Sequence, residues 1–336
     1  MDSLSALSPE HQAVVSWLLA CDEPWTAYRA RIDLMDRPSD EPAVLEARAS
    51  LVTDPRIREL ISHARTWGGK PLKRHNDASH PFTTLGVLAD FGLTRADPGI
   101  DAIWQSISAH VSDEDFFESL LNIPERFGGS GEDEWAWIAC DAYALLYPLL
   151  AFGYGAEPTV SRAVAALVKR SSDVGWRCAA ASRFGSFKGP GKREHPCPIA
   201  TVHGLKALSQ VNEAVDSPAA RAGVEMLLHH WDVQGNQKYF LFGIGTDFRK
   251  PKYPMLWYDI VHVVDVLSRF PLALRDARFR RMADELLGQL DEDGRVTARS
   301  MYRAWKGWSF ADKKHPSPWL TLLAHRIARR FAAANV

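Results

Sequence analysis

A histidine and a cysteine stand one residue apart in the stretch GPGKREHPCPIATVHGLKAL (189–208), where a proline separates His195 from Cys197. Imidazole nitrogen and thiolate sulfur are ligands that zinc favours in proteins. A third candidate ligand, His262, follows in the segment MLWYDIVHVVDVLSRF (255–270). Three protein ligands leave the fourth position of a tetrahedral zinc ion open, as in catalytic sites. The residue types and their spacing therefore predict a zinc site.

Two aspartates flank His262 at intervals of three residues, so Asp259, His262 and Asp265 would share one face of a helix. A metal-bound histidine usually donates its second ring N–H to a carboxylate, and either aspartate could accept it. We count both aspartates, together with the neighbouring Tyr258, as candidate catalytic residues.

A further cysteine, Cys178 in GWRCAAAS, could substitute for one zinc ligand or add a fourth. A fourth protein ligand would close the site and indicate a structural metal. The alternative without metal is a solvated loop histidine at 195, a small buried side chain at Cys197 and a hydrogen-bonded core histidine at 262.

Basic side chains recur in the loops near these residues. The formal net charge of −1 gives no overall attraction for nucleic acid or an anionic membrane, so any anion site must be local. If the loops meet at one rim of the fold, their cations could hold a diphosphate; otherwise they are simply solvated. The candidate anion-binding residues are Lys192, Arg193, Arg249 and Lys250.

Aromatic residues are frequent, with 12 tryptophans in 336 residues. Aromatic faces could line a pocket for a hydrocarbon and stabilise a developing cation, although at helical spacing many belong to the core. Trp176, Trp257 and Trp305 are the candidates for contact with substrate.

The stretch KRHNDASHPF supplies two further histidines, His75 and His80. They could contact substrate or form a second pair of metal ligands. The alternative is a polar turn that caps the helix after Pro81.

The elements that must position these residues are helical, because apolar residues recur at intervals of three and four. The predicted helices cover 134–153, 159–172, 198–211, 218–231, 255–270, 276–290 and 318–334.

Similar proline turns precede several of these helices, at Pro81, Pro196, Pro254 and Pro316. The intervals are 115, 58 and 62 residues, so the first interval holds two repeats of about 60 residues. Helix pairs of this kind stack side by side, with the more apolar helix inside. We predict an all-α fold in which residues 1–336 form a single α/α toroid, with N-terminal helices in 1–70 and repeats in 71–336. An open α-solenoid is the alternative.

Two stretches resemble the zinc-binding β subunits of protein prenyltransferases, α/α toroids related to squalene cyclases and similar to bacterial prenyltransferase-repeat proteins. FKGPGKREHPCPIATVHGLKAL resembles the loop in which basic residues precede an Asp-x-Cys ligand pair, and YDIVHVVDVLS resembles the Asp-x-x-His helix. The resemblance carries Cys197 and His262 over as zinc ligands, and Lys192 and Arg193 as diphosphate contacts. At the aspartate position this sequence has His195, which leaves the site one charge less negative.

The resemblance implies a zinc-dependent transferase in which Zn²⁺ activates a small thiol acceptor that attacks an isoprenoid or other diphosphate donor. No partner subunit is evident, so a small-molecule substrate is favoured over a protein. The alternatives are a zinc lyase or hydrolase, and a binding scaffold with structural zinc.

The start of the chain has no basic segment followed by an apolar run, and no stretch approaches the about 18 apolar residues of a membrane span. We therefore expect a cytoplasmic protein without a membrane span. Its four cysteines are then reduced thiols or metal ligands.

Overall fold

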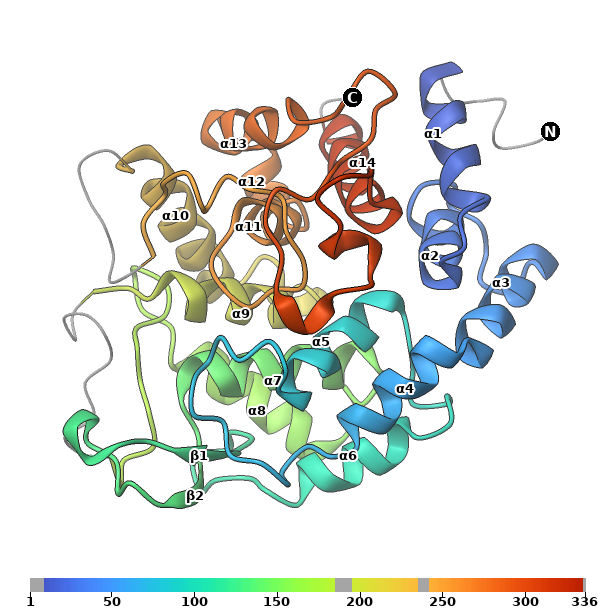
Figure 1. Ribbon diagram of the computed structural model, residues 1–336. Helices are drawn as coiled ribbons and strands as arrows, with labels where there is room; N and C mark the ends of the chain where they lie inside the picture. Colours follow the sequence, from blue (N-terminus) through green and yellow to red (C-terminus); the bar gives the residue numbers. More distant parts are fainter. Residues whose placement is uncertain (1–8, 185–194, 235–241, 335–336) are drawn as a thin grey trace.

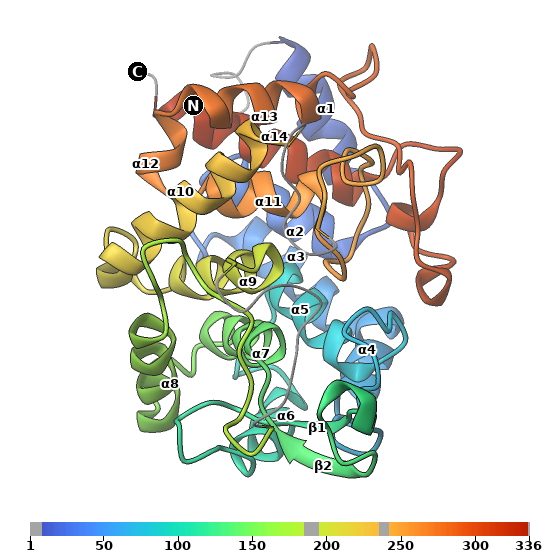
Figure 2. The ribbon, with the colours of Figure 1, turned by 90° about the vertical axis from the view of Figure 1, so that its left-hand side faces the viewer.

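The computed structural model describes residues 9–184, 195–234 and 242–334, and its regular structure is almost entirely helical (Figure 1). The helices form an inner layer surrounded by an outer layer (Figure 2). The inner helices are α2 (Pro24–Asp33), α5 (Pro81–Phe91), α7 (Ala139–Ala151), α9 (Pro198–Leu208), α11 (Ile260–Leu267) and α14 (Pro318–Ala333).

The outer helices are α1 (Pro9–Leu19), α3 (Pro42–Thr53), α4 (Pro55–Ala64), α6 (Ile100–Ser108), α8 (Pro158–Lys169), α10 (Pro218–Asp232) and α13 (Ala277–Leu287). Most of the outer helices, though not α1 and α3, are amphipathic and bury one face. Shorter elements complete the connections: α12 (Pro271–Leu274), η2 (Glu125–Phe127), η3 (Asn212–Ala214), η4 (Arg303–Trp305), η5 (Ser309–Ala311), β1 (Ser119–Asn122) and β2 (Asp133–Ala136). Over the described ranges, no helix is long and apolar enough to cross a lipid bilayer.

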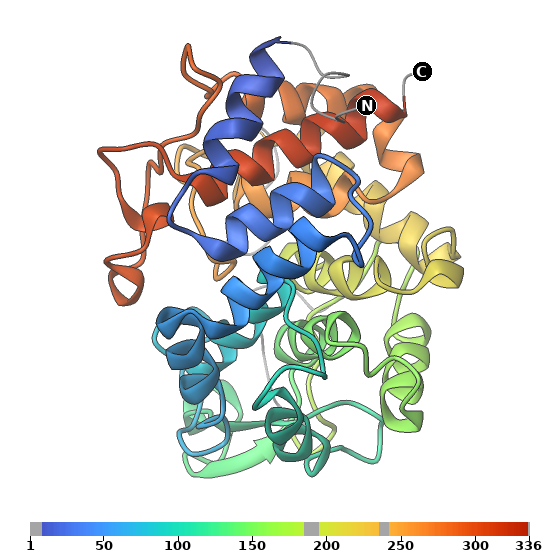
Figure 3. The same cartoon turned by 90° about the vertical axis from the view of Figure 1, so that its right-hand side faces the viewer.

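The inner layer closes into a ring. Each inner helix packs on the next in chain order, and α2 packs on both α14 and α5. Figure 3 shows the C-terminal helix, in red, lying beside the N-terminal helices, in blue. The contact between chain ends is tied by Arg326 of α14, which binds Asp33 of α2 at 3.1 Å and Asp265 of α11 at 2.8 Å. The predicted all-α toroid is therefore confirmed, and the open solenoid is excluded.

Proline starts many of the helices because its fixed φ suits the first helical turn, where its missing N–H costs nothing. Two of the predicted helices begin five residues later in the structure than expected. The helix predicted over 255–270 begins only at Ile260, since the Asp259 carboxylate caps it by accepting the His262 backbone N–H at 3.2 Å. The helix predicted from 134 begins at Ala139, because 133–136 pairs with β1 in an antiparallel ladder.

The two ends of the ring differ in chemistry. Near the carboxyl ends of the inner helices, Asp90 of α5 and Lys206 of α9 form a buried ion pair at 2.8 Å. The hydroxyls of Tyr147 and Tyr253 donate to the same carboxylate at 2.7 and 3.0 Å. A hydrogen-bonded polar cluster therefore fills the ring interior near the carboxyl ends of the inner helices. The cavity described below lies at the other end, where α5, α7 and α9 begin.

A pair of helical glycines tests how tightly the layers pack. A Cβ on Gly223 of α10 would lie 2.6 Å from Cζ3 of Trp176 and 3.1 Å from the Leu205 side chain, whereas a Cβ on Gly86 of α5 meets nothing within 4 Å. We expect Gly223→Ala to lower the free energy of unfolding by about 1–3 kcal/mol through overpacking. Gly86→Ala should raise it by up to about 1 kcal/mol, because alanine is the better helix former. Urea unfolding of both variants checks the contrast, and equal effects would contradict the packing.

Candidate metal centre and cavity

A cavity of about 100 Å³ lies at the amino-terminal ends of α5, α7 and α9. Its wall is mainly apolar, with a few polar side chains converging on one side. The lining residues are His75, Phe82, Thr83, Ile138, Cys140, Asp141, Cys178, Cys197, Ile199, His203, Phe242, Met255, Leu256 and Trp257.

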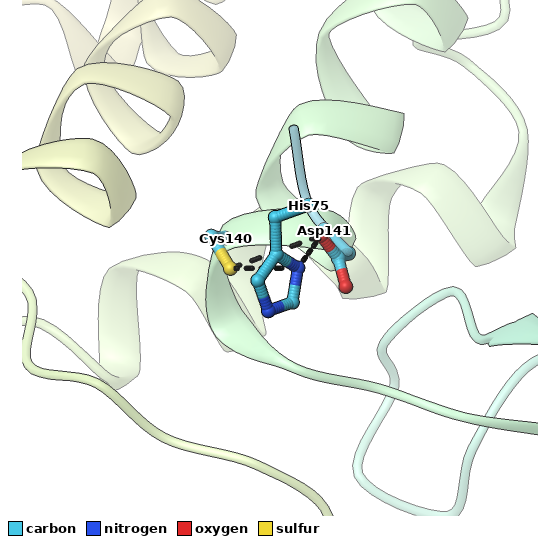
Figure 4. Close-up of side chains that lie close together, drawn as sticks. All are labelled: His75, Cys140 and Asp141. Atoms are coloured by element: carbon cyan, nitrogen blue, oxygen red, sulfur yellow. Dashed lines mark hydrogen bonds and ion pairs between the residues drawn. The ribbon is translucent and has the colours of Figure 1, made fainter. Parts of the chain in front are cut away.

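Three potential metal ligands converge at the wall of this cavity (Figure 4). Cys140 and Asp141 come from the first turn of α7, and His75 comes from the loop before α5. The imidazole Nδ1 of His75 lies 2.8 Å from Oδ1 of Asp141 and 3.7 Å from Sγ of Cys140, and the sulfur lies 3.8 Å from the same carboxylate oxygen. Asp141 is buried with 3% of its side chain exposed, whereas 46% of the His75 side chain is exposed.

The donor atoms are spaced nearly as a tetrahedral ion requires. With zinc–nitrogen and zinc–oxygen bonds of about 2.0 Å and zinc–sulfur bonds of about 2.3 Å, neighbouring ligand atoms stand about 3.3–3.6 Å apart. The two distances to Cys140 Sγ are close to this range, and the shorter His75–Asp141 distance is that of a hydrogen bond. Oδ2 of Asp141 is buried and has no hydrogen-bond partner among the described residues. A buried carboxylate oxygen without a protein partner is free to accept a hydrogen bond from a bound water or to bind an ion, so the residues present are compatible with a metal ion.

The same residues do not form a Cys-His-Asp nucleophilic triad. In such a triad the cysteine and the carboxylate contact different nitrogens of the histidine, but here both lie at Nδ1 of His75. Burial also raises the pKa of the Cys140 thiol well above its usual value, with the Asp141 carboxylate adding to the effect. Without a metal ion, Cys140 is therefore a neutral thiol at pH 7 and a poor nucleophile.

Two more cysteines line the same cavity. Burial raises the pKa of Cys178 to about 12 and that of Cys197 well above its ordinary value. The chain around Cys178 runs beside both the start of α7 and the turn before α9, through isolated antiparallel bridges that join Ile138 to Ala180 and Arg177 to Pro196. Cys178 and Cys197, both predicted as ligands from the sequence, lie with Cys140 at one cavity.

The predicted ligands His195 and His262 are not among the residues that line this cavity. Nδ1 of His262 lies 2.8 Å from Oδ2 of Asp259, so Asp259 does hold the imidazole as the spacing suggested. His262 is buried, and its ring stacks on Tyr253. In the part of the chain that the structure describes, His195, Cys197 and His262 do not form a group whose ligand atoms lie within 4.8 Å of one another.

Asp265 and Tyr258 also point to other partners. The Asp265 carboxylate binds three arginines, with Arg269 Nη2 at 2.7 Å, so it is not available to orient His262. The hydroxyl of Tyr258 lies 3.2 Å from Nδ1 of His230, and Tyr258 does not line the cavity.

Of the predicted substrate contacts, Trp257 lines the cavity and packs on Phe242. Trp176 is fully buried and donates from Nε1 to the Leu167 carbonyl at 2.9 Å, which makes it part of the core between the layers. Trp305 is likewise buried and donates to the backbone carbonyl of Ala78.

The stretch KRHNDASHPF does cap α5, but the capping side chain is His80 itself and not the expected Asn76, Asp77 or Ser79. Nδ1 of His80 accepts the Phe82 backbone N–H at 3.2 Å, and its Nε2 donates to the Lys70 carbonyl at 3.0 Å. Burial lowers the pKa of His80 and keeps the imidazole neutral.

Of the basic residues predicted to bind an anion, Arg249 and Lys250 do not lie at the cavity. Arg249 pairs with Glu285 at 3.0 Å and lies over the Trp231 ring. Lys250 lies 3.7 Å from the Asp247 carboxylate. Lys192 and Arg193 lie outside the described residues.

Cys140 and Asp141 were not predicted as site residues from the sequence. The available signal was positional, because Cys140 stands at the start of an inner helix as Cys197 does one repeat later. Because the helix was predicted to begin at 134, Cys140 was expected well inside it, and its match to the position of Cys197 was not apparent.

No known protein family matches this sequence, and no curated protein matches it. Among solved structures, the type II terpene cyclase MstE from Scytonema, in its apo form, is similar to this chain with a TM-score of 0.44 and 14% sequence identity. The alignment covers 100% of this chain and 99% of that chain. At this level of similarity, no activity or residue role is carried over from that enzyme.

The contact with Asp141 predicts how His75 titrates. The carboxylate raises the pKa of His75 above its ordinary value of 6.5 because it stabilises the imidazolium. In metal-free protein the contribution of this pair to stability is then complete below pH 6.5 and is lost as the pH rises through the raised pKa. Proton NMR of the metal-free protein should give a His75 midpoint above 6.5 that falls in Asp141→Asn. A midpoint unchanged by the substitution would contradict the ion pair.

Proposed function

We propose that this protein is a zinc-dependent transferase that joins a short hydrocarbon group to a small thiol. The reaction would take place in the cavity at the amino-terminal ends of α5, α7 and α9. The observation that carries this proposal is the convergence of His75, Cys140 and Asp141, with its unpartnered buried oxygen, on an apolar cavity. Imidazole, thiolate and carboxylate together favour zinc over magnesium or calcium, which prefer oxygen ligands alone.

Nδ1 of His75, Sγ of Cys140 and the carboxylate of Asp141 would hold the ion. Zinc bound there would lower the pKa of a substrate thiol so that thiolate is present at neutral pH. Because Cys140 and His75 must lose protons when they bind a metal, zinc affinity should increase with pH.

The cavity wall would orient both reactants. Phe82, Ile199 and Trp257 supply apolar surface for the hydrocarbon group. His203 projects from α9 into the same cavity, and burial lowers its pKa to about 3, so its imidazole is neutral and can donate its one ring N–H to the bound thiolate. The proposed role of His203 is therefore to orient the acceptor.

The donor is proposed to be an allylic diphosphate, as the resemblance implies. No lysine or arginine is among the described residues that line the cavity. Recognition of the diphosphate would then fall to Lys192 and Arg193, the candidates from the sequence.

Thioether formation tests the proposal. Zinc-loaded protein is incubated with dimethylallyl diphosphate and a small thiol such as 2-mercaptoethanol, and the products are identified by mass spectrometry. The proposal predicts the prenyl thioether with loaded protein and none with chelator-treated protein. Release of the prenyl alcohol instead would favour a hydrolase, and zinc binding without any turnover would favour the scaffold with structural metal; either result overturns the transferase.

A further inference from the structure

A groove on the opposite end of the toroid is lined by arginines. It has a volume of about 690 Å³ and lies where α9 and α11 end and α14 passes toward the end of the chain. Among the described residues that line it, there is no aspartate or glutamate. The polar residues that line this arginine groove are Ser209, Gln210, Ser268, Arg269, Arg275 and Arg330.

In the ion-pair network that contains Arg269 and Arg330, positive charges outnumber negative charges. Two carboxylates, those of Asp33 and Asp265, are shared by four guanidinium groups, which leaves an excess of two positive charges. The arginines that bind them are Arg29, Arg269, Arg326 and Arg330. Arg275, which is exposed at the edge of the groove, adds another charge and has no ion-pair partner among the described residues.

The guanidinium groups are held in place before any ligand arrives. Arg269 donates to Ser209 Oγ at 3.3 Å, and Arg330 donates to Ser268 Oγ at 3.0 Å. Nε of Arg269 is buried without a hydrogen-bond partner among the described residues. Burial and the positive charges of Arg326 and Arg269 lower the pKa of Arg330 to about 10. The lowered pKa is consistent with several positive charges lying close together. The carbonyls at the ends of α9 and α11 offset only part of this charge.

We propose that the arginine groove binds the phosphate or diphosphate group of a small molecule. Arginine forks match phosphate oxygens with paired charge-assisted hydrogen bonds, and side chains already fixed in position lose little entropy on binding. A bound anion would neutralise the excess charge that Asp33 and Asp265 leave uncompensated. This site lies at the other end of the ring from the proposed zinc centre and does not depend on it.

Calorimetric titration at constant ionic strength tests the proposal, with sodium diphosphate, sodium phosphate and a phosphate monoester as separate probes. We expect saturable binding of diphosphate, weakened about tenfold or more in Arg275→Gln and in Arg330→Gln. Arg275 is exposed, so its substitution should leave folding intact even if Arg330→Gln destabilises the protein. Arg58→Gln, an exposed arginine on α4, is the matched control and should bind as the wild type does.

The probes and one further variant separate the possible outcomes. Tighter binding of the monoester than of inorganic phosphate would identify an organic phosphate as the ligand. Binding that is retained in metal-free Cys140→Ser assigns the anion to the groove, whereas binding lost in that variant would place it at the metal centre and overturn the proposal. Absence of saturation by any probe, or equal loss in Arg58→Gln, would also overturn it.

Discussion

Replacement of Cys140 by serine should reduce zinc affinity by more than about 100-fold, because loss of a partner that only orients a ligand already costs about 10–100-fold. Serine keeps the volume of the side chain, but its hydroxyl does not replace the thiolate as a zinc ligand. Wild-type protein dialysed against metal-free buffer should retain about one zinc ion per chain, and Cys140→Ser should retain almost none. Elemental analysis and competition with a chromophoric chelator measure the two quantities.

The matched control is Cys21→Ser. Cys21 lies outside the cavity, and its thiol donates to the Leu18 carbonyl at 3.0 Å. It should bind zinc as the wild type does. If Cys140→Ser keeps its zinc while His262→Ala loses it, the ligand set would be the one predicted from the sequence resemblance and not the one at α7. A wild-type protein that binds no zinc would contradict both sets.

Asp90→Ala should lower the free energy of unfolding by about 3–5 kcal/mol. The substitution leaves the ammonium group of Lys206, only 6% exposed, without its carboxylate in the middle of the ring. It also removes the acceptor for the hydroxyls of Tyr147 and Tyr253. Urea unfolding followed by circular dichroism measures the loss.

The double variant Asp90→Leu with Lys206→Met separates an unpaired charge from a general packing defect. Apolar residues of similar volume often replace a buried ion pair with little loss, so the double variant should recover most of the stability. Asp216→Asn removes an exposed ion pair with Arg221 and should change stability by less than about 1 kcal/mol. A double variant as unstable as Asp90→Ala would contradict the proposed cause.

The helices of the fold could be predicted because helix formation depends largely on residues close together in the sequence. Apolar spacing indicated the helices, and proline turns indicated where α5, α9 and α14 begin. The errors at 134–138 and 255–259 arose where a short-range alternative prevailed, a strand ladder in the first segment and an aspartate cap in the second. Periodicity alone does not detect either one.

The candidate site was predictable only in part. His75, Cys178 and Cys197 were recognised as ligand types in the sequence, and all three line one cavity. Asp265 had the correct spacing to serve His262, yet it faces Arg269 and Arg326 because a buried carboxylate is stabilised most by the cations packed around it. Spacing along a helix sets the direction of a side chain but not its partner.

The sequence by itself determined a ring-forming set of helix pairs and supplied its ligand-bearing residues. Only the tertiary structure decided which residues meet, since His75 and Cys140 are far apart in the chain and come together when α5 packs on α7. Ring closure also brings the amino ends of α5, α7 and α9 together at the cavity and gathers Arg269, Arg275 and Arg330 at the opposite end. The physical reason is that burial of the apolar helix faces fixes the ring, and the ring fixes which polar side chains become neighbours.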